Sequence, residues 1–254
     1  EVRLTPNPIV KVLSTLSCHG VRHLLMGGQA CVFYGAAEFS RDCDVVLLAD
    51  GDNFARLQAA LTELQAACIA VPPFEADFLR RGHAVHFRCE HSDAPGMRLD
   101  VMTTMRGVDS FDKLWNRRTT LVDDAGQVYE VLGVADLVRA KKTQRDKDWP
   151  MIRRLVESHY ATYRDEVTKA RVEFWLKESR TPEMLIALAA SYPAAARSCA
   201  KERPLLQEAF GASRSALAKE LLAEELAERD RDRCYWEPLK RELEALRRAN
   251  RTKQ

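Results

Sequence analysis

The chain lacks any long hydrophobic run and any regular pairing of cysteines. No stretch approaches the roughly 20 apolar residues that a membrane-spanning helix needs, so we expect no membrane partner. Its seven cysteines are odd in number and scattered, and no Cys-x-x-Cys pair occurs. This spacing disfavours a disulfide framework or a zinc site, and it favours reduced thiols in a cytoplasmic protein.

No sign of charge dominates, and several well-known catalytic motifs are missing. Lys and Arg number 39 against 37 Asp and Glu, so the net charge of +2 does not by itself indicate nucleic-acid binding. A Walker loop, a Rossmann glycine fingerprint and a Gly-x-Ser-x-Gly elbow are all absent. His83 and His86 share a predicted strand but would face opposite sides, so core or surface roles suit them better than metal binding.

The first part of the chain alternates between helical and strand patterns. We predict helices over 9–16, 28–36, 53–67 and 110–117, strands over 21–26, 42–48, 68–71, 83–89 and 97–103, and a hairpin over 119–132. Pro8 suits a first helical turn, Asp52 is the predicted N-cap of the third helix, and Asp124-Ala125-Gly126 is the predicted hairpin turn. This mixture predicts an α+β (α/β-like) domain with a mixed sheet.

After Gly133 every apolar pattern has a helical period. We predict helices over 134–144, 149–159, 164–178, 182–190, 212–229 and 238–248. With 254 residues the chain is long enough for two modest domains. We therefore expect a sheet domain over 1–150 and an all-helical domain over 151–254, with the boundary somewhere between 133 and 160.

The most informative stretch is Gly27-Gly28, followed after thirteen residues by Asp42-Cys43-Asp44 in an apolar run. Two carboxylates one residue apart on a strand share a face, with α-carbons about 6.5–7 Å apart. They repel each other unless a cation lies between them, so a divalent metal is the natural occupant. A glycine pair lets the backbone approach a phosphate closely. Asp100 adds a third carboxylate on a later strand, where Leu99 and Val101 would face the opposite side.

These residues resemble the DNA polymerase β nucleotidyltransferase superfamily, in particular the minimal nucleotidyltransferases and AbiEii-like toxins. The resemblance covers roughly residues 20–150. It implies that Asp42, Asp44 and Asp100 hold two Mg²⁺ ions and that Asp100 orients or deprotonates the attacking hydroxyl. Gly27 and Gly28 would open a helix whose amides receive the triphosphate of an NTP substrate.

The same resemblance assigns phosphate-binding roles to further residues. Lys141 is the first choice for contacting triphosphate oxygens because it extends the apolar stripe of its helix, and Lys142 is the reserve. Relatives often read Arg-x-Thr-x-Asp-x-Asp before the strand. This chain has Glu38 in place of the arginine, Ser40 in place of the threonine, and Arg41 as a cation at a shifted position.

Simpler interpretations remain open for each residue. Asp42 and Asp44 could begin a solvated strand, Asp100 could be a surface carboxylate, and the glycine pair could mark a strand-to-helix turn. Lys141 and Lys142 could lie on a solvated helix face.

Two functions follow from the resemblance. The first is a Mg²⁺-dependent nucleotidyltransferase that moves an NMP to a hydroxyl of a protein, a tRNA or a small molecule, in a toxin-like role. The second is a module of the same fold that only binds nucleotide or RNA, which the Glu38 departure keeps open. The sequence leaves the oligomeric state open.

Overall fold

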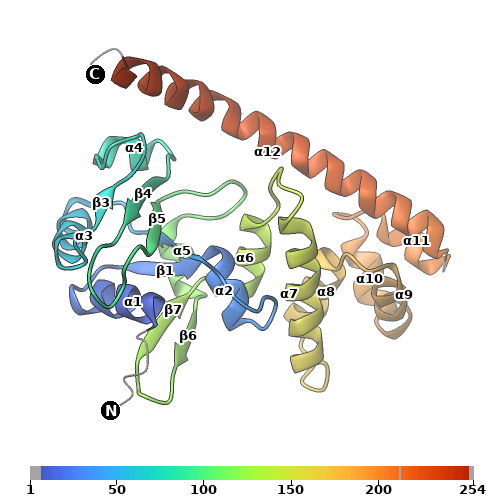
Figure 1. The fold of residues 1–254 in the computed structure, drawn as a ribbon. Coiled ribbons are helices and arrows are strands. Elements are labelled where there is room, and N and C mark those ends of the chain that lie inside the picture. Colours follow the sequence, from blue (N-terminus) through green and yellow to red (C-terminus); the bar gives the residue numbers. More distant parts are fainter. Residues whose placement is uncertain (1–6, 212, 252–254) are drawn as a thin grey trace. The chain divides into compact units, whose positions relative to one another are not determined.

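A computed structural model describes residues 7–211 and 213–251 of the chain. Within this part, the fold is α+β, with a mixed sheet followed by helices, as predicted (Figure 1). No helix in these ranges combines the length and apolar character needed to cross a membrane. All seven cysteines lie in these ranges, and none of them forms a disulfide.

The chain forms two compact units. The first comprises Glu1–Phe33, Ala37–Leu137 and Trp236–Gln254, and the second comprises Tyr34–Ala36 and Val138–Tyr235. The change of unit between Leu137 and Val138 lies inside the interval from 133 to 160 in which the boundary was predicted, although the ranges given for the two domains were 1–150 and 151–254. Trp236–Gln254 group with the first unit, which the sequence did not predict.

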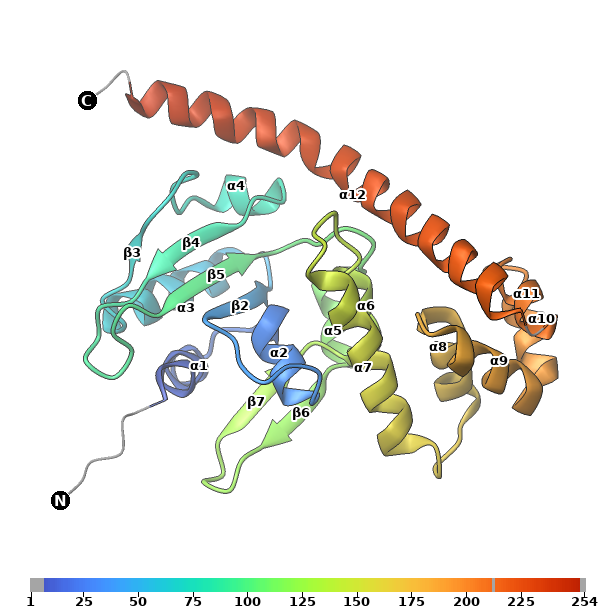
Figure 2. The same ribbon diagram turned by 45° about the vertical axis from the view of Figure 1, so that its right-hand side comes forward.

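The first unit is built on seven strands, counted over the described residues (Figure 2). They are β1 (His23–Met26), β2 (Asp42–Leu47), β3 (Ala67–Cys68), β4 (Val85–Arg88), β5 (Arg98–Met102), β6 (Thr119–Val122) and β7 (Val128–Val131). Their order is β3-β4-β5-β2-β1-β7-β6. The β2–β5 and β1–β7 pairs are parallel, and the other neighbours are antiparallel.

The helices of the first unit differ in how they begin, and only some have a side-chain N-cap. They are α1 (Pro8–Cys18), α2 (Gly27–Phe33), α3 (Gly51–Glu63), α4 (Ala76–Arg80) and α5 (Phe111–Asn116). Pro8 does lie in the first turn of α1, after the N-cap Asn7. The N-cap of α3 is Asp50 and not the predicted Asp52, because the Asp50 carboxylate accepts a 2.6 Å hydrogen bond from the Asn53 amide.

Asn53 also joins α3 to two strands. Its fully buried side chain accepts a 2.7 Å hydrogen bond from the Arg22 amide and donates to the carbonyl oxygens of Arg22 and Leu48. Arg22 precedes β1 and Leu48 follows β2. One amide side chain therefore satisfies three backbone groups at the end of the β1–β2 pair where β1 begins and β2 ends.

The hairpin forms as predicted. β6 and β7 pair antiparallel, and Gly126 in the turn has a φ of +79°. The Asp123 carboxylate accepts hydrogen bonds from the amides of Ala125 and Gln127, which closes the turn.

The second unit is helical. It contains α7 (Asp148–Tyr163), α8 (Lys169–Glu178), α9 (Pro182–Ser191), α10 (Pro193–Cys199) and α11 (Leu206–Phe210). Trp175 of α8 is fully buried and contacts the rings of His159 and Tyr160 from α7. α8 begins at Lys169 and not at the predicted residue 164, because Thr168 caps it by accepting from the Arg171 amide.

Two helices carry residues of both units. They are α6 (Val134–Ala140) and α12 (Arg214–Arg251). The sequence predicted separate helices over 212–229 and 238–248, but α12 is continuous and contains Pro238. Residue 212, where the first of these was predicted to begin, lies outside the described residues. The short helices α4, α10 and α11 were not predicted, since each covers at most two turns.

Candidate functional site

The alternation of β2 and β5 separates an apolar face from a charged face. Cys43 and Val45 of β2, like Leu99 of β5, are fully buried. Asp42, Asp44 and Asp100 alternate with them and are partly exposed. The predicted alternation around Asp100 is therefore confirmed, and all three carboxylates lie on the same side of the sheet.

The strand register brings two of these carboxylates together. β2 and β5 pair in parallel with Asp44 opposite Asp100 and Asp42 opposite Arg98. Residues directly opposite each other in a sheet project to the same face and interact. Three carboxylates on two adjacent strands therefore share this face with the guanidinium of Arg98.

Asp100 is the best-held carboxylate of the three. Its Oδ1 accepts a 2.7 Å hydrogen bond from Arg98 Nε and lies 2.9 Å from His86 Nδ1, which in turn is 3.1 Å from Arg98 Nη2. His86 is opposite Asp100 in the antiparallel β4–β5 pair. Burial raises the pKa of Asp100, but the bonds from His86 and Arg98 outweigh burial and leave that pKa below its ordinary value.

Asp44 lies against the backbone of Gly27. A Cβ atom built on Gly27 would be 1.9 Å from Asp44 Oδ2, far closer than atoms can approach. Gly27 also has a φ of +68°, which L side chains rarely adopt. The contact with Asp44 and the positive φ therefore both require glycine where β1 ends and α2 begins. This glycine lies directly beside Asp44, a predicted metal ligand.

Gly28 and Ser40 form a second close contact. A Cβ atom on Gly28 would be 2.6 Å from Ser40 Oγ. That hydroxyl donates a 3.0 Å hydrogen bond to the Asp42 carbonyl oxygen. Ser40 therefore fixes the start of β2 from the loop that precedes it. Arg41 is exposed, and its guanidinium carbon lies 5.7 Å from the centroid of the Phe39 ring.

Lys141 and Lys142 belong to the second unit. Lys141 Nζ lies 3.2 Å from Asp148 Oδ1, and Lys142 Nζ lies 2.7 Å from Glu178 Oε2. The helix predicted over 134–144 ends at Ala140, so both lysines follow α6 and Lys141 does not extend its stripe. Lys141 is buried and Lys142 is partly buried, so neither lies on a solvated helix face. Their predicted contacts with triphosphate oxygens stay a prediction.

The donors on the charged face suit a hard divalent cation in kind, because Mg²⁺ prefers carboxylate oxygens. In the part of the chain that the structure describes, no group of three or more His, Cys, Asp or Glu side chains is arranged to hold a metal ion. Asp100 gives one reason, since Arg98 and His86 both engage its Oδ1. Asp42, Asp44 and Asp100 thus fit the ion in chemistry and in strand face, and the two-ion site stays a prediction.

Sequence reasoning missed Arg98 and His86. Arg98 could have been found, because it precedes Asp100 by two residues and so shares its face. His86 could not, because its approach to Asp100 depends on the pairing of β4 with β5. His83 lies before β4 and not on it; its buried ring has Nε2 2.7 Å from Glu242 Oε2.

Comparison with known protein families and with curated proteins found no relative of this chain. No model of a known protein family matches the sequence, and no curated protein matches it.

Proposed function

We propose that this protein is a Mg²⁺-dependent nucleotidyltransferase, which transfers an NMP group from an NTP to a hydroxyl and releases pyrophosphate. One observation carries the proposal. Asp44 and Asp100 are in register on adjacent parallel strands, and the backbone of Gly27 is packed against the Asp44 carboxylate. Three carboxylates on one sheet face, next to a glycine pair that opens a helix, form a suitable site for a metal-bound triphosphate.

Asp42, Asp44 and Asp100 would hold the magnesium. When bound, magnesium would neutralise charge on the phosphates and stabilise the attacking and leaving oxygens. The remaining contribution of the chain is positional. Arg98 and His86 fix the Asp100 carboxylate, while Gly27 leaves room for that of Asp44.

The environment of Asp100 favours orienting the acceptor hydroxyl over removing its proton. The hydrogen bonds from His86 and Arg98 hold the pKa of Asp100 below its ordinary value. A carboxylate with a lowered pKa is a weaker base, so it accepts a hydrogen bond from the hydroxyl more readily than it takes the proton. Asp100 would therefore align the attacking oxygen.

Ser40 and Gly28 would shape the phosphate side of the site. The Ser40 hydroxyl donates to the Asp42 carbonyl oxygen and lies where a Cβ on Gly28 would have to be. Glycine at 28 thus leaves room for the Ser40 hydroxyl beside the first turn of α2. The acceptor is a protein, a tRNA or a small molecule, and a toxin-like role in a bacterial cytoplasm belongs to the same proposal.

A second candidate is a module that binds nucleotide or RNA without transferring anything. The contacts of Asp100 favour it, because Arg98 already compensates this carboxylate without a metal ion. Exposed Glu38, where relatives have arginine, acts in the same direction by removing a phosphate-binding cation.

The test is label transfer from each of the four α-³²P-labelled NTPs with Mg²⁺ and a cell extract as the source of acceptors. Asp44→Asn keeps the shape of the side chain but removes its charge, and we expect label transfer to fall by on the order of 100-fold or more. Asp77→Asn, an exposed carboxylate on α4, is the matched control and should leave transfer unchanged. Transfer that persists in Asp44→Asn contradicts the enzyme, and NTP binding without any transfer supports the binding module.

A further inference from the structure

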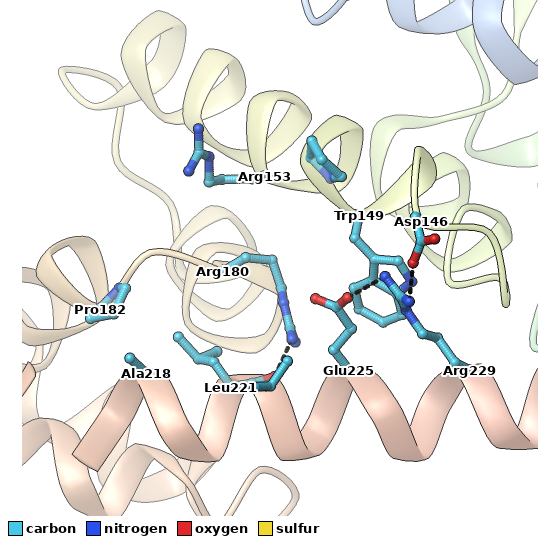
Figure 3. Close-up of a pocket in the computed structure, with 11 residues that line it drawn as sticks. Asp146, Trp149, Arg153, Arg180, Pro182, Ala218, Leu221, Glu225 and Arg229 are labelled. Atoms are coloured by element: carbon cyan, nitrogen blue, oxygen red, sulfur yellow. Dashed lines mark hydrogen bonds and ion pairs between the residues drawn. The ribbon is translucent and has the colours of Figure 1, made fainter. Parts of the chain in front are cut away.

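The second unit contains a cavity of about 450 Å³ (Figure 3). Its walls come from the first turns of α7, the segment that enters α9, and one face of α12. Trp149, Arg153, Arg180, Leu221, Leu222 and Arg229 line it. The volume is in the range of small-molecule sites, and all of these residues belong to the second unit.

Arg180, which lines the pocket, belongs to a buried group of charges in which positive groups outnumber negative ones. Arg180 donates to the Glu224 carboxylate and to the Leu221 carbonyl oxygen. Arg203 binds the same carboxylate through Nε at 2.9 Å and Nη2 at 2.7 Å. The side chains of Arg180 and Arg203 are only 8% and 6% exposed, so two buried guanidinium groups share one carboxylate.

The other ion pair of the pocket does not cancel this excess. Arg229 Nη2 binds Glu225 at 2.6 Å, and Arg229 also pairs with Asp146, which is almost fully exposed (Figure 3). Arg229 Nε is buried and has no hydrogen-bond partner among the described residues. The mostly buried charges here are therefore three guanidinium groups against two carboxylates, Glu224 and Glu225.

Burial makes this excess costly for Arg180. Desolvation lowers the pKa of its guanidinium and the positive charge of Arg203 adds to this, while the carboxylates of Glu224 and Glu225 oppose the shift without cancelling it. A second anion beside Arg180 would relieve the imbalance, because a buried charge without a full counter-charge destabilises its surroundings. In Figure 3 the Arg180 side chain extends from its loop toward α12 and along the pocket.

The rest of the lining is apolar. The Arg180 guanidinium carbon lies 4.9 Å from the centroid of the Trp149 ring. Leu221 is buried, whereas Leu222 is 55% exposed despite its size. An inorganic ion would use the guanidinium and leave these surfaces in water, while a ligand with an apolar part covers both.

We propose that this pocket binds a small organic anion, whose carboxylate or phosphoryl group pairs with Arg180 while its apolar part contacts Trp149 and Leu222. The inference is independent of the chemistry proposed for the sheet, because every residue that carries it belongs to the second unit.

Isothermal titration calorimetry of the full chain without Mg²⁺ tests this with three probes of one ring system: naphthoate, naphthyl phosphate and neutral naphthylmethanol. We expect at least one anion to bind at a single site, and the alcohol to bind roughly tenfold more weakly or not at all. Naphthoate and naphthyl phosphate distinguish a carboxylate ligand from a phosphoryl ligand.

Two matched variants place the site. Arg180→Gln removes the guanidinium but affects a buried network, so Leu222→Glu serves as the second variant, because it adds a carboxylate at an exposed position of the lining. Leu226→Glu is the control: it is 51% exposed, lies one turn further along α12 and does not line the pocket. Leu222→Glu should weaken anion binding roughly tenfold, and Leu226→Glu should not. Equal binding of the alcohol, equal loss in both leucine variants, or no saturable anion binding overturns the proposal.

Discussion

The two units gather charged groups of opposite sign. On the sheet of the first unit, three carboxylates, those of Asp42, Asp44 and Asp100, share a face with the guanidinium of Arg98. In the second unit, the buried guanidinium groups of Arg180 and Arg203 share the carboxylate of Glu224. Both places use the same Arg–carboxylate bonds, so the bonds alone do not mark a site. The sign of the more numerous groups differs, and it indicates which kind of ligand each place would attract.

The largest expected effect comes from removing the shared carboxylate of the second unit. Glu224→Gln leaves Arg180 and Arg203 without a counter-charge, and the free energy of unfolding should fall by about 3–5 kcal/mol. Chemical denaturation measures it. Glu183→Gln is the control, because its pair with Arg214 is exposed at 3.6 Å and should contribute less than about 1 kcal/mol. A similar loss in both variants would show that the carboxylate shared by Arg180 and Arg203 stabilises the fold no more than an exposed ion pair does.

Comparing Gly27 with Gly126 in the first unit distinguishes the cost of a strained backbone from the cost of a steric clash. Gly27→Ala and Gly126→Ala both place a side chain at positive φ, at +68° and +79°, which costs about 1–2 kcal/mol each. Nothing lies within 4 Å of a Cβ on Gly126, whereas a Cβ on Gly27 meets Asp44 Oδ2. Gly27→Ala should therefore lose about 1–3 kcal/mol more in a denaturation experiment. Equal losses would refute a tight contact at Asp44.

Acid should weaken the second unit through His159. Its Nδ1 accepts a 2.9 Å hydrogen bond from Trp175 Nε1, and burial, aided by Arg171, lowers its pKa to about 4 from 6.5. Because the unfolded chain binds this proton more tightly, stability falls as the pH drops from 6.5 to 4, by about 2–3 kcal/mol.

Unfolding titrations followed by tryptophan fluorescence measure this slope. His159→Gln keeps an acceptor but does not titrate, so it should flatten the slope. His23 of the first unit, whose pKa burial also lowers, stays intact in both proteins and acts as the internal reference. An unchanged slope in His159→Gln would show that the acid sensitivity does not come from His159.

The smallest expected effect is stabilisation of the first unit by a cation. At ten times its dissociation constant, Mg²⁺ should raise the free energy of unfolding by about 1.4 kcal/mol. Asp42→Asn combined with Asp44→Asn should abolish this gain, since it removes two of the three carboxylates. Asp77→Asn should retain it. The same Mg²⁺ response in the double variant would place the ion elsewhere.

Features that depend only on residues close together in the chain could be predicted from the sequence. Alternation placed Asp100 on the face opposite Leu99, and the glycine pair was expected where a strand gives way to a helix, which is where β1 ends and α2 begins. Strand pairing is not local, which is why His86 was assigned to core or surface and not to Asp100. The pocket of the second unit was missed for the same reason, since Arg180 and Glu224 are 44 residues apart.

Helix ends were predicted less well than helix faces. The helical period predicted over 53–67 agrees with α3, where Phe54, Leu57 and Leu61 are buried, but the cap was placed two residues late. The helices predicted separately over 212–229 and 238–248 are one helix, although Pro238 inside it removes a backbone hydrogen bond and crowds the preceding turn. The helix continues through it because strong helix formers such as Lys240, Arg241 and Leu243 follow.

Asn53 has a consequence for the carboxylates, although it lies at the other end of β2. Arg22 and Leu48, which it ties together, extend the β1–β2 register that sets Met26 opposite Asp44. A slip of one residue would turn Asp42 and Asp44 into the apolar layer and bring Cys43 to the charged face. The chemistry of the sheet is thus specified partly by a neutral amide that bonds to none of the three carboxylates, and a search for essential positions confined to those carboxylates would overlook it.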